Sequence, residues 1–498
     1  MAVSSANVKA VFDKLTAANL IGTGPPTVPW GDAPTLDKVK RALERDVDAL
    51  PFVYRRVYVD ELREQLPAVI RQLNTADNRF LIETLVGAVY DHGEDDVAAP
   101  LGRFLAVVSN LYRSFLDAET RTKVDLPLIE NVPPLAMFQR SGGHGPFTLP
   151  ADGVQSLIGS TTGVVSMPSA CRDHPFTWGS LAHETGGHDV LHADPGLIDE
   201  LSAGVRQFFG ADGRIDPLRP TGAQILGLLW AWWMDETASD VYGLLNMGPA
   251  FAMNLTVFLA AFIATFQHTK EPLLRAETGR DPNDVMDVHP VDLIRPHVAI
   301  GAIQALTGLD ATTKSDYVTT LETMADDCSG GATEIGLVGQ LPFGDNRALP
   351  LRHRVPIADM QDAARRVGSF IVSTRLRTLG GHSIQDLETW DDADEAVATR
   401  IAKTFALDAS AVGIGDDAQL LAGATRAILD DPAKYDQVTK RLNDALDHSF
   451  AVDPLWGTPQ PDLLWMPVRP IDADHFLDRD PIEIELVGRE AELIAAAA

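Results

Sequence analysis

The stretch from Val241 to Gln267 contains no charged residue, and this feature most restricts how the chain can fold. Its sequence, VYGLLNMGPAFAMNLTVFLAAFIATFQ, is long enough to cross a bilayer. Two asparagines and the pair Gly248-Pro249 interrupt it, and acidic residues precede it closely. Because proline inside a helix breaks the hydrogen-bond ladder, we expect two buried core helices that separate near Pro249.

The composition indicates that the chain can form a large packed core. The chain has 498 residues, of which 45% are hydrophobic and 22% are charged, so two or three domains are expected. The 70 acidic and 41 basic residues give a formal charge of −29. A field of this sign repels phosphate backbones and anionic lipids, so we expect neither a nucleic acid nor a membrane partner. The sequence leaves the oligomeric state open.

The cysteines and the amino-terminal residues suggest a cellular location. Cys171 and Cys328 are the two cysteines and lie far apart, which excludes a disulfide framework and a CxxC metal site. The first residues, MAVSSANVKAVFDKL, lack the apolar segment of a signal peptide. We therefore expect a cytoplasmic protein.

Periodicity along the chain predicts a mainly α fold with a small β region. Apolar residues at Leu36, Val39, Leu43, Val47 and Leu50 follow helical spacing, and later segments in the first third look alike. Residues 126–139 and 153–170 are rich in Pro, Gly, Ser and β-branched residues, which favours short strands and turns. Residues 328–350 are typical of a loop or linker.

These changes in character divide the chain into three expected regions. Residues 1–125 form an amino-terminal helical region, and residues 126–345 form the core that carries the chemistry. Residues 346–498 form a carboxy-terminal helical region, whose Pro-rich tail begins near Trp456 and is expected to wrap the surface.

The segment HETGGHDVLH, from His183 to His192, holds three histidines and a glutamate. On a regular α-helix His183 and His188 point about 140° apart, so they could not share a metal ion. A π-bulge takes one extra residue into a turn and would bring them to one face. The two glycines between them favour irregular backbone. We expect a bulge or break at residues 185–187, with Glu184 near the metal.

The alternative pair, His188 and His192, needs no bulge because four residues separate the two histidines. That arrangement would turn His183 away and make Asp189 the candidate base. The helical spacing by itself favours this second pair, so the choice depends on a third ligand.

A third ligand is available in WAWWMDETASDVYGLL, 48 residues further on. Catalytic zinc takes three protein ligands and keeps one position open for water. Glu236 can supply a carboxylate, and Asp240, one turn later, can accept a hydrogen bond from a ligand histidine. These acids could instead form a solvated helix face. The tryptophans and leucines around them leave little solvent face, and buried carboxylates require partners.

These residues carry a resemblance to a known family. The segment DETASDVYG resembles the third-ligand helix of the gluzincin metallopeptidases, where an Asn-Glu-x-x-Ser-Asp pattern supplies the zinc-binding Glu and the orienting Asp. Glu236, Ser239 and Asp240 match it, and Asp235 departs from the Asn. The segment LAHETGGH is similar to the HExxxH variant of dipeptidyl-peptidase III. The resemblance covers about residues 160–300 and implies one zinc per chain, held by His183, His188 and Glu236.

The same resemblance implies roles for further residues. Gluzincins use a cationic or hydrogen-donating group to stabilise the oxyanion, and His289 and Tyr242 are the candidates here. Arg295 is expected to contact the ligand residues without binding the metal ion itself. The strand expected in GVVSMPSA would be the sheet edge along which an extended peptide aligns.

The expected function is a zinc metallopeptidase that acts on a peptide or protein substrate. Zinc would activate a water, Glu184 would take its proton, and the hydroxide would attack the peptide carbonyl. Two alternatives stay open, namely a non-catalytic metal-stabilised binding or scaffold protein and a zinc hydrolase of another amide or ester. An intact Glu184 argues against the scaffold.

Overall fold

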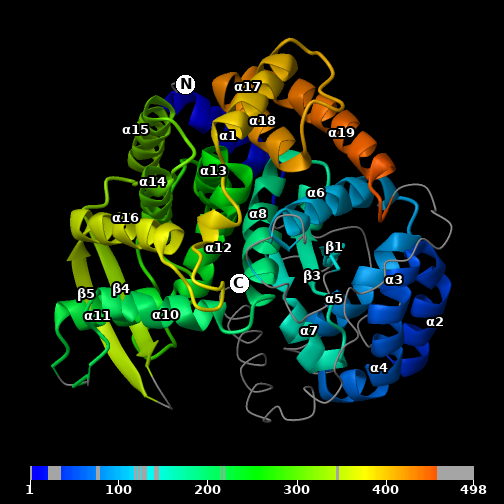
Figure 1. The fold of residues 1–498 in the computed structure, drawn as a ribbon, viewed down its shortest axis with the longest axis horizontal. Coiled ribbons are helices and arrows are strands. Elements are labelled where there is room, and N and C mark those ends of the chain that lie inside the picture. Colours follow the sequence, from blue (N-terminus) through cyan, green and yellow to red (C-terminus); the bar gives the residue numbers. More distant parts are fainter. Residues whose placement is uncertain are drawn as a thin grey trace.

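The computed structural model describes residues 3–20, 35–73, 79–116, 121, 124, 132–139, 145–213, 215–216, 219–343 and 347–456. Over these residues the chain is mainly helical, with one three-stranded and one two-stranded sheet (Figure 1). The expected mainly α architecture with a small β region is therefore confirmed. The Pro-rich tail expected after Trp456 lies outside the described residues.

The helices expected in the first third of the chain are present. They are α1 (Ser5–Ala17), α2 (Leu36–Asp46), α3 (Phe52–Tyr54), α4 (Asp60–Leu73), α5 (Arg79–Tyr90) and α6 (Ala98–Leu116). The apolar face expected from the spacing is buried in α2, where Val39 and Leu43 are at most 1% exposed. Helices α2 to α5 group on one side of the molecule (Figure 1). In contrast, α1 reaches the carboxy-terminal helices, where Asn7 Nδ2 donates to the carbonyls of Leu429 (2.8 Å) and Asp430 (2.9 Å).

The three-stranded sheet lies beside the helices of the candidate site. Its strands are β1 (Leu135–Gln139), β2 (Phe147–Leu149) and β3 (Val164–Pro168), in the order β1-β3-β2. β3 pairs parallel with β1 and antiparallel with β2, so both of its edges are occupied. The expectation that β3 forms the free substrate-binding edge is therefore wrong, and β2 is the strand whose Thr148 contacts Glu184 on the histidine-bearing helix.

One segment expected as strand and turn is a helix. Residues Ala151–Ile158 form α7, which ends at Gly159 with a left-handed backbone of φ 82°. Val154 and Ile158, four residues apart, are both buried on one face of this helix. The Gly and Ser residues of this stretch dominated its composition and masked that short apolar spacing.

The uncharged stretch forms two core helices, as expected. They are α12 (Met234–Met247) and α13 (Pro249–Gln267), and Gly248 between them has φ 76°. A Cβ on Gly248 would lie 2.4 Å from the ring of Trp390, so the chain reverses there only with glycine. Within the described residues, α13 is the one helix long and apolar enough to span a membrane, and 72% of that window is buried inside the protein.

Other helices surround α12 and α13, which run through the middle of the molecule (Figure 1). Those before residue 330 are α8 (Leu181–His183), α9 (Val190–His192), α10 (Leu197–Phe208), α11 (Gly222–Trp232), α14 (Arg295–Ala305) and α15 (Ala311–Asp327). The carboxy-terminal ones are α16 (Ile357–Ser373), α17 (Asp392–Ala406), α18 (Asp417–Asp430) and α19 (Tyr435–Val452). One large apolar cluster includes Phe12, Trp233 and Leu442, so residues from all three expected regions share a core.

The segment expected as a linker near residue 340 is a β-hairpin. Strand β4 (Glu334–Pro342) pairs antiparallel with β5 (Ala348–Pro356). Ile335, Leu337 and Leu341 fall on alternate positions of β4 and are at most 1% exposed, which is the pattern of a half-buried strand. Glycines within β4 interrupt this alternation, so the sequence pattern did not indicate a strand. The expectation of a loop or linker is wrong for residues 334–342.

Candidate metal centre

The helix that carries the three histidines contains the expected bulge. It begins as α8, continues as a π-helical turn from Glu184 to Asp189 and ends as α9. The extra residue in this turn brings His183 and His188 to the same side, with their Nε2 atoms 3.2 Å apart. The expectation of an irregular backbone at residues 185–187 is confirmed.

The two glycines of this turn allow the helix to approach α12 closely. A Cβ on Gly187 would lie 2.2 Å from the Cβ of Ser239 and 2.5 Å from its Cα. A Cβ on Gly186 would lie 3.0 Å from the ring of Tyr242. The glycines therefore do more than permit the π-turn, because they also bring the two motif-bearing helices into contact.

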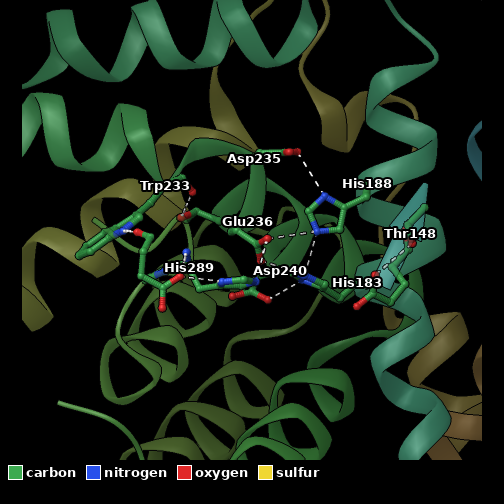
Figure 2. Close-up of polar contacts among 12 residues, drawn as sticks. Thr148, His183, His188, Trp233, Asp235, Glu236, Asp240 and His289 are labelled. Atoms are coloured by element: carbon green, nitrogen blue, oxygen red, sulfur yellow. Dashed lines mark hydrogen bonds and ion pairs between the residues drawn. The ribbon is translucent and has the colours of Figure 1, made fainter. Parts of the chain in front are cut away.

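Glu236 completes a set of three possible metal ligands (Figure 2). Its Oε2 is 3.2 Å from His183 Nε2, and its Oε1 is 3.5 Å from His188 Nε2. Tetrahedral zinc with bonds of 2.0–2.1 Å would place its ligand atoms about 3.4 Å apart. The two Nε2 atoms lie 3.2 Å apart, and their distances of 3.2 and 3.5 Å to the two different oxygens of Glu236 are close to that spacing. Glu236 is only 7% exposed, and its Oε2 accepts no hydrogen bond from the described residues, which leaves a buried oxygen for a cation.

Asp240 and Arg295 hold His183 in place behind these ligands. His183 Nδ1 lies 2.9 Å from Asp240 Oδ1. A carboxylate can only accept, so Nδ1 carries the proton and the Nε2 lone pair is free for a metal ion. Burial opposes the ionisation of Asp240, but Arg295 and His183 hold its pKa below its ordinary value. Arg295 thus supports the ligands through Asp240.

Glu184, the candidate base, follows His183 directly and is 7% exposed. Thr148 of the edge strand β2 donates from Oγ1 to Glu184 Oε2 (3.0 Å). Figure 2 draws Thr148 on the His183 side of the cluster. Thr148 could not be predicted from the sequence, because nothing in a three-residue strand indicates which helix it will touch.

His289 meets Glu236 from the opposite side of the cluster (Figure 2). Its Nε2 is 3.2 Å from Glu236 Oε1, and its Nδ1 is 2.8 Å from Asp287 Oδ1. Burial lowers the pKa of His289, but the charge of Glu236 and the bond to Asp287 raise it overall. The indole Nε1 of Trp233 donates to the Asp287 carbonyl (3.0 Å) and anchors this loop. The imidazole, 32% exposed, can reach both solvent and the cluster.

Tyr242 adjoins Gly186 of the π-helical turn. Its ring is fully buried and packs edge-on against Phe115 of α6, with the centroids 5.2 Å apart. Its hydroxyl is near Asn246 and Ser114, and burial raises its pKa well above the ordinary value. The structure thus places the Tyr242 ring in the packing between α6 and α12, which leaves His289 as the candidate that contacts Glu236.

A second group of polar side chains adjoins the first. Asp235 Oδ1 lies 3.4 Å from His188 Nδ1 and 3.1 Å from His192 Nε2. His192 Nδ1 is in turn 3.3 Å from Asp152 Oδ2, on α7. From the sequence, Asp235 was a departure from the family pattern, and His192 was expected to be a supporting or surface histidine, with a ligand role as the alternative. The four-residue spacing of His188 and His192 was the feature of the sequence that indicated this second group.

Comparisons with known proteins add no relative. No protein-family model matches the chain, and the searches of curated protein sequences and of solved structures give no match.

Proposed function

We propose that this protein is a zinc-dependent hydrolase that cleaves peptide bonds, with zinc held by His183, His188 and Glu236. One observation carries the proposal. The Nε2 atoms of His183 and His188 lie 3.2 Å apart, and each lies 3.2–3.5 Å from one oxygen of Glu236, which is 48 residues after His188 on another helix. Glu236 Oε2 accepts no hydrogen bond from the described residues. This spacing suits a tetrahedral ion with one position left for water.

The residues around the ligands suit the steps of hydrolysis. Zinc bound here would lower the pKa of a water molecule and polarise the scissile carbonyl. Glu184, held by Thr148, would take the proton of the attacking water and return it to the leaving amine. His289, held by Asp287, would donate a hydrogen bond to the oxyanion.

The presence of Glu184 favours a hydrolase over a metal-stabilised scaffold, since a structural site has no use for a base beside its ligands. The order of the two motifs supports a gluzincin-like enzyme. An enzyme that hydrolyses another amide or an ester would use the same groups, so the substrate class is the part that requires experiment. The two free, buried cysteines support a cytoplasmic location.

The test combines metal content with turnover. The purified chain should contain zinc and should cleave members of a peptide library, while His188→Ala and Glu236→Ala should lose both properties. His353→Ala, at an exposed histidine of β5, is the matched control and should keep both. Full zinc in both ligand variants would place the metal elsewhere. Zinc-loaded protein that cleaves esters or other amides but no peptide would correct the substrate class.

A further inference from the structure

We propose that His188, His192 and Asp235 form a second divalent-cation site, which shares the imidazole of His188 with the metal centre described above. The inference extends the proposed function, because both sites use His188. The cations suited to such a nitrogen-rich site are Zn²⁺ and Cu²⁺.

The geometry of this second group repeats that of the first. One ligand atom from each of His188, His192 and Asp235 lies within 4.8 Å of the others, as in the first group. Asp235 Oδ1 is 3.4 Å from His188 Nδ1 and 3.1 Å from His192 Nε2. These separations again match the roughly 3.4 Å expected between ligands of a tetrahedral ion.

Each site also has a carboxylate that orients one histidine. His183 directs Nε2 toward the first site while Asp240 binds its Nδ1 at 2.9 Å. His192 directs Nε2 toward Asp235 while Asp152 binds its Nδ1 at 3.3 Å. A carboxylate on the far nitrogen is the usual partner of a metal-binding histidine, because it fixes the ring and the tautomer.

His188 faces both groups with different nitrogens. Its Nε2 lies toward His183 and Glu236, and its Nδ1 lies toward Asp235 (Figure 2). With a cation on Nε2, binding of a second cation forms a bond to Nδ1 and breaks the Nδ1–H bond. That proton leaves to water, and the imidazole becomes a bridging anion. No electron is transferred.

The charges near the histidines favour two cations over one. Asp240 and Asp287 pair with Arg295 and Arg275. In this cluster, the ion pairs of Asp152, Asp235 and Glu236 within the described residues are formed with histidines. These three charges and one anionic imidazole are balanced by two divalent cations. A single cation with neutral histidines would leave one negative charge on the cluster.

The second group is also accessible. Asp235 is 34% exposed and His192 is 20% exposed, against 10% for the Glu236 side chain. A cation could therefore enter from solvent and retain water in its open position.

The experiment titrates the metal-free full-length chain with Zn²⁺ and separately with Cu²⁺. Wild-type protein should bind two equivalents, whereas His192→Ala and Asp235→Ala should bind one. His353→Ala should bind two. His192→Gln, which keeps more of the side-chain volume, replaces the alanine variant if circular dichroism shows that the latter is unfolded.

Cu²⁺ supplies a readout that a structural role would not change. Two copper ions on one imidazole couple magnetically, so the paramagnetic resonance signal per copper should fall when the second equivalent binds. In His192→Ala the single copper should give full signal. One equivalent in wild type, unchanged in His192→Ala, would overturn the proposal, as would two uncoupled equivalents that His192→Ala retains.

The same data separate the two proposals. Two coupled ions without turnover of any peptide, amide or ester would leave the second site intact and remove the hydrolase. One ion with peptide cleavage would remove the second site and keep the hydrolase.

Discussion

Arg295 donates two hydrogen bonds to the carboxylate of Asp240, from Nη2 to Oδ1 at 2.6 Å and from Nε to Oδ2 at 2.7 Å. The same Oδ1 receives the Nδ1–H of His183 at 2.9 Å. All three side chains are at most 7% exposed. The orientation of a candidate zinc ligand therefore depends on an ion pair between α12 and α14, and two predictions follow from this contact.

Asp240→Asn should weaken zinc binding by about 10–100-fold, as is usual when the partner of a ligand histidine is changed. The amide keeps the shape but loses the charge that favours the Nδ1–H tautomer. A competition titration against a chelator measures the change. Asp447→Asn, at a half-exposed carboxylate, should leave the affinity unchanged. Equal affinities in the two variants would show that Asp240 does not act on the metal.

Arg295→Ala should lower the free energy of unfolding by about 3–5 kcal/mol, because it leaves the Asp240 charge buried without its arginine partner. Denaturant unfolding of the metal-free protein gives this value without a contribution from zinc. Arg354→Ala removes an exposed pair with Glu277 and should cost at most about 1 kcal/mol. A similarly small loss in Arg295→Ala would mean that Asp240 is solvated or protonated.

Glu184→Gln should keep the zinc and the fold while turnover falls by about 10²–10⁴, the usual contribution of a general base. Glutamine can still accept the Thr148 hydroxyl but cannot take a proton. Metal analysis and single-turnover kinetics on the same sample separate the two properties. Wild-type rates in this variant would eliminate the proposed mechanism.

Gly187→Ala should destabilise the protein by about 1–3 kcal/mol or more, because the new methyl group meets the backbone of Ser239 at 2.5 Å. Helix α12 would have to move, so zinc affinity should fall as well. Gly222→Ala is the control, since a Cβ there meets nothing within 4 Å. Both quantities come from unfolding curves recorded with and without zinc. A neutral Gly187→Ala would contradict the close approach of the two helices.

Asp417→Asn should change how stability depends on pH. Burial raises the pKa of Asp417 to about 7, although a hydrogen bond from Ser449 opposes the shift. The protonated Asp417 carboxyl stabilises the folded state. This contribution is fully present below the unfolded pKa of about 4 and is lost as pH rises through about 7. The variant should therefore gain melting temperature relative to wild type from pH 5 to pH 8. Asp436 is exposed, so the melting temperature of Asp436→Asn should depend on pH in the same way as that of wild type.

Local sequence rules were sufficient for the regular helices and for the break at Pro249. The 3.6-residue spacing of α2 and the fixed φ of proline act over a few residues, so their consequences can be derived without the rest of the chain. The π-turn was predictable for the same reason, because five-residue spacing cannot bring His183 and His188 together on a regular helix. The short α7 and the hairpin β4–β5 were missed, since glycines diluted patterns that span only a few residues.

The sequence by itself determined which residues could bind a metal ion and that a bulge was needed to bring them together. Only the tertiary structure decided which groups meet, because those contacts join elements far apart in the chain. Thr148 reaches Glu184 from an edge strand, and Asp287 holds His289 on a loop that Trp233 anchors. Tyr242 lies on the same helix as Glu236, yet it faces α6. The direction of a side chain relative to a distant element follows from how the helices pack, and no local pattern carries that information.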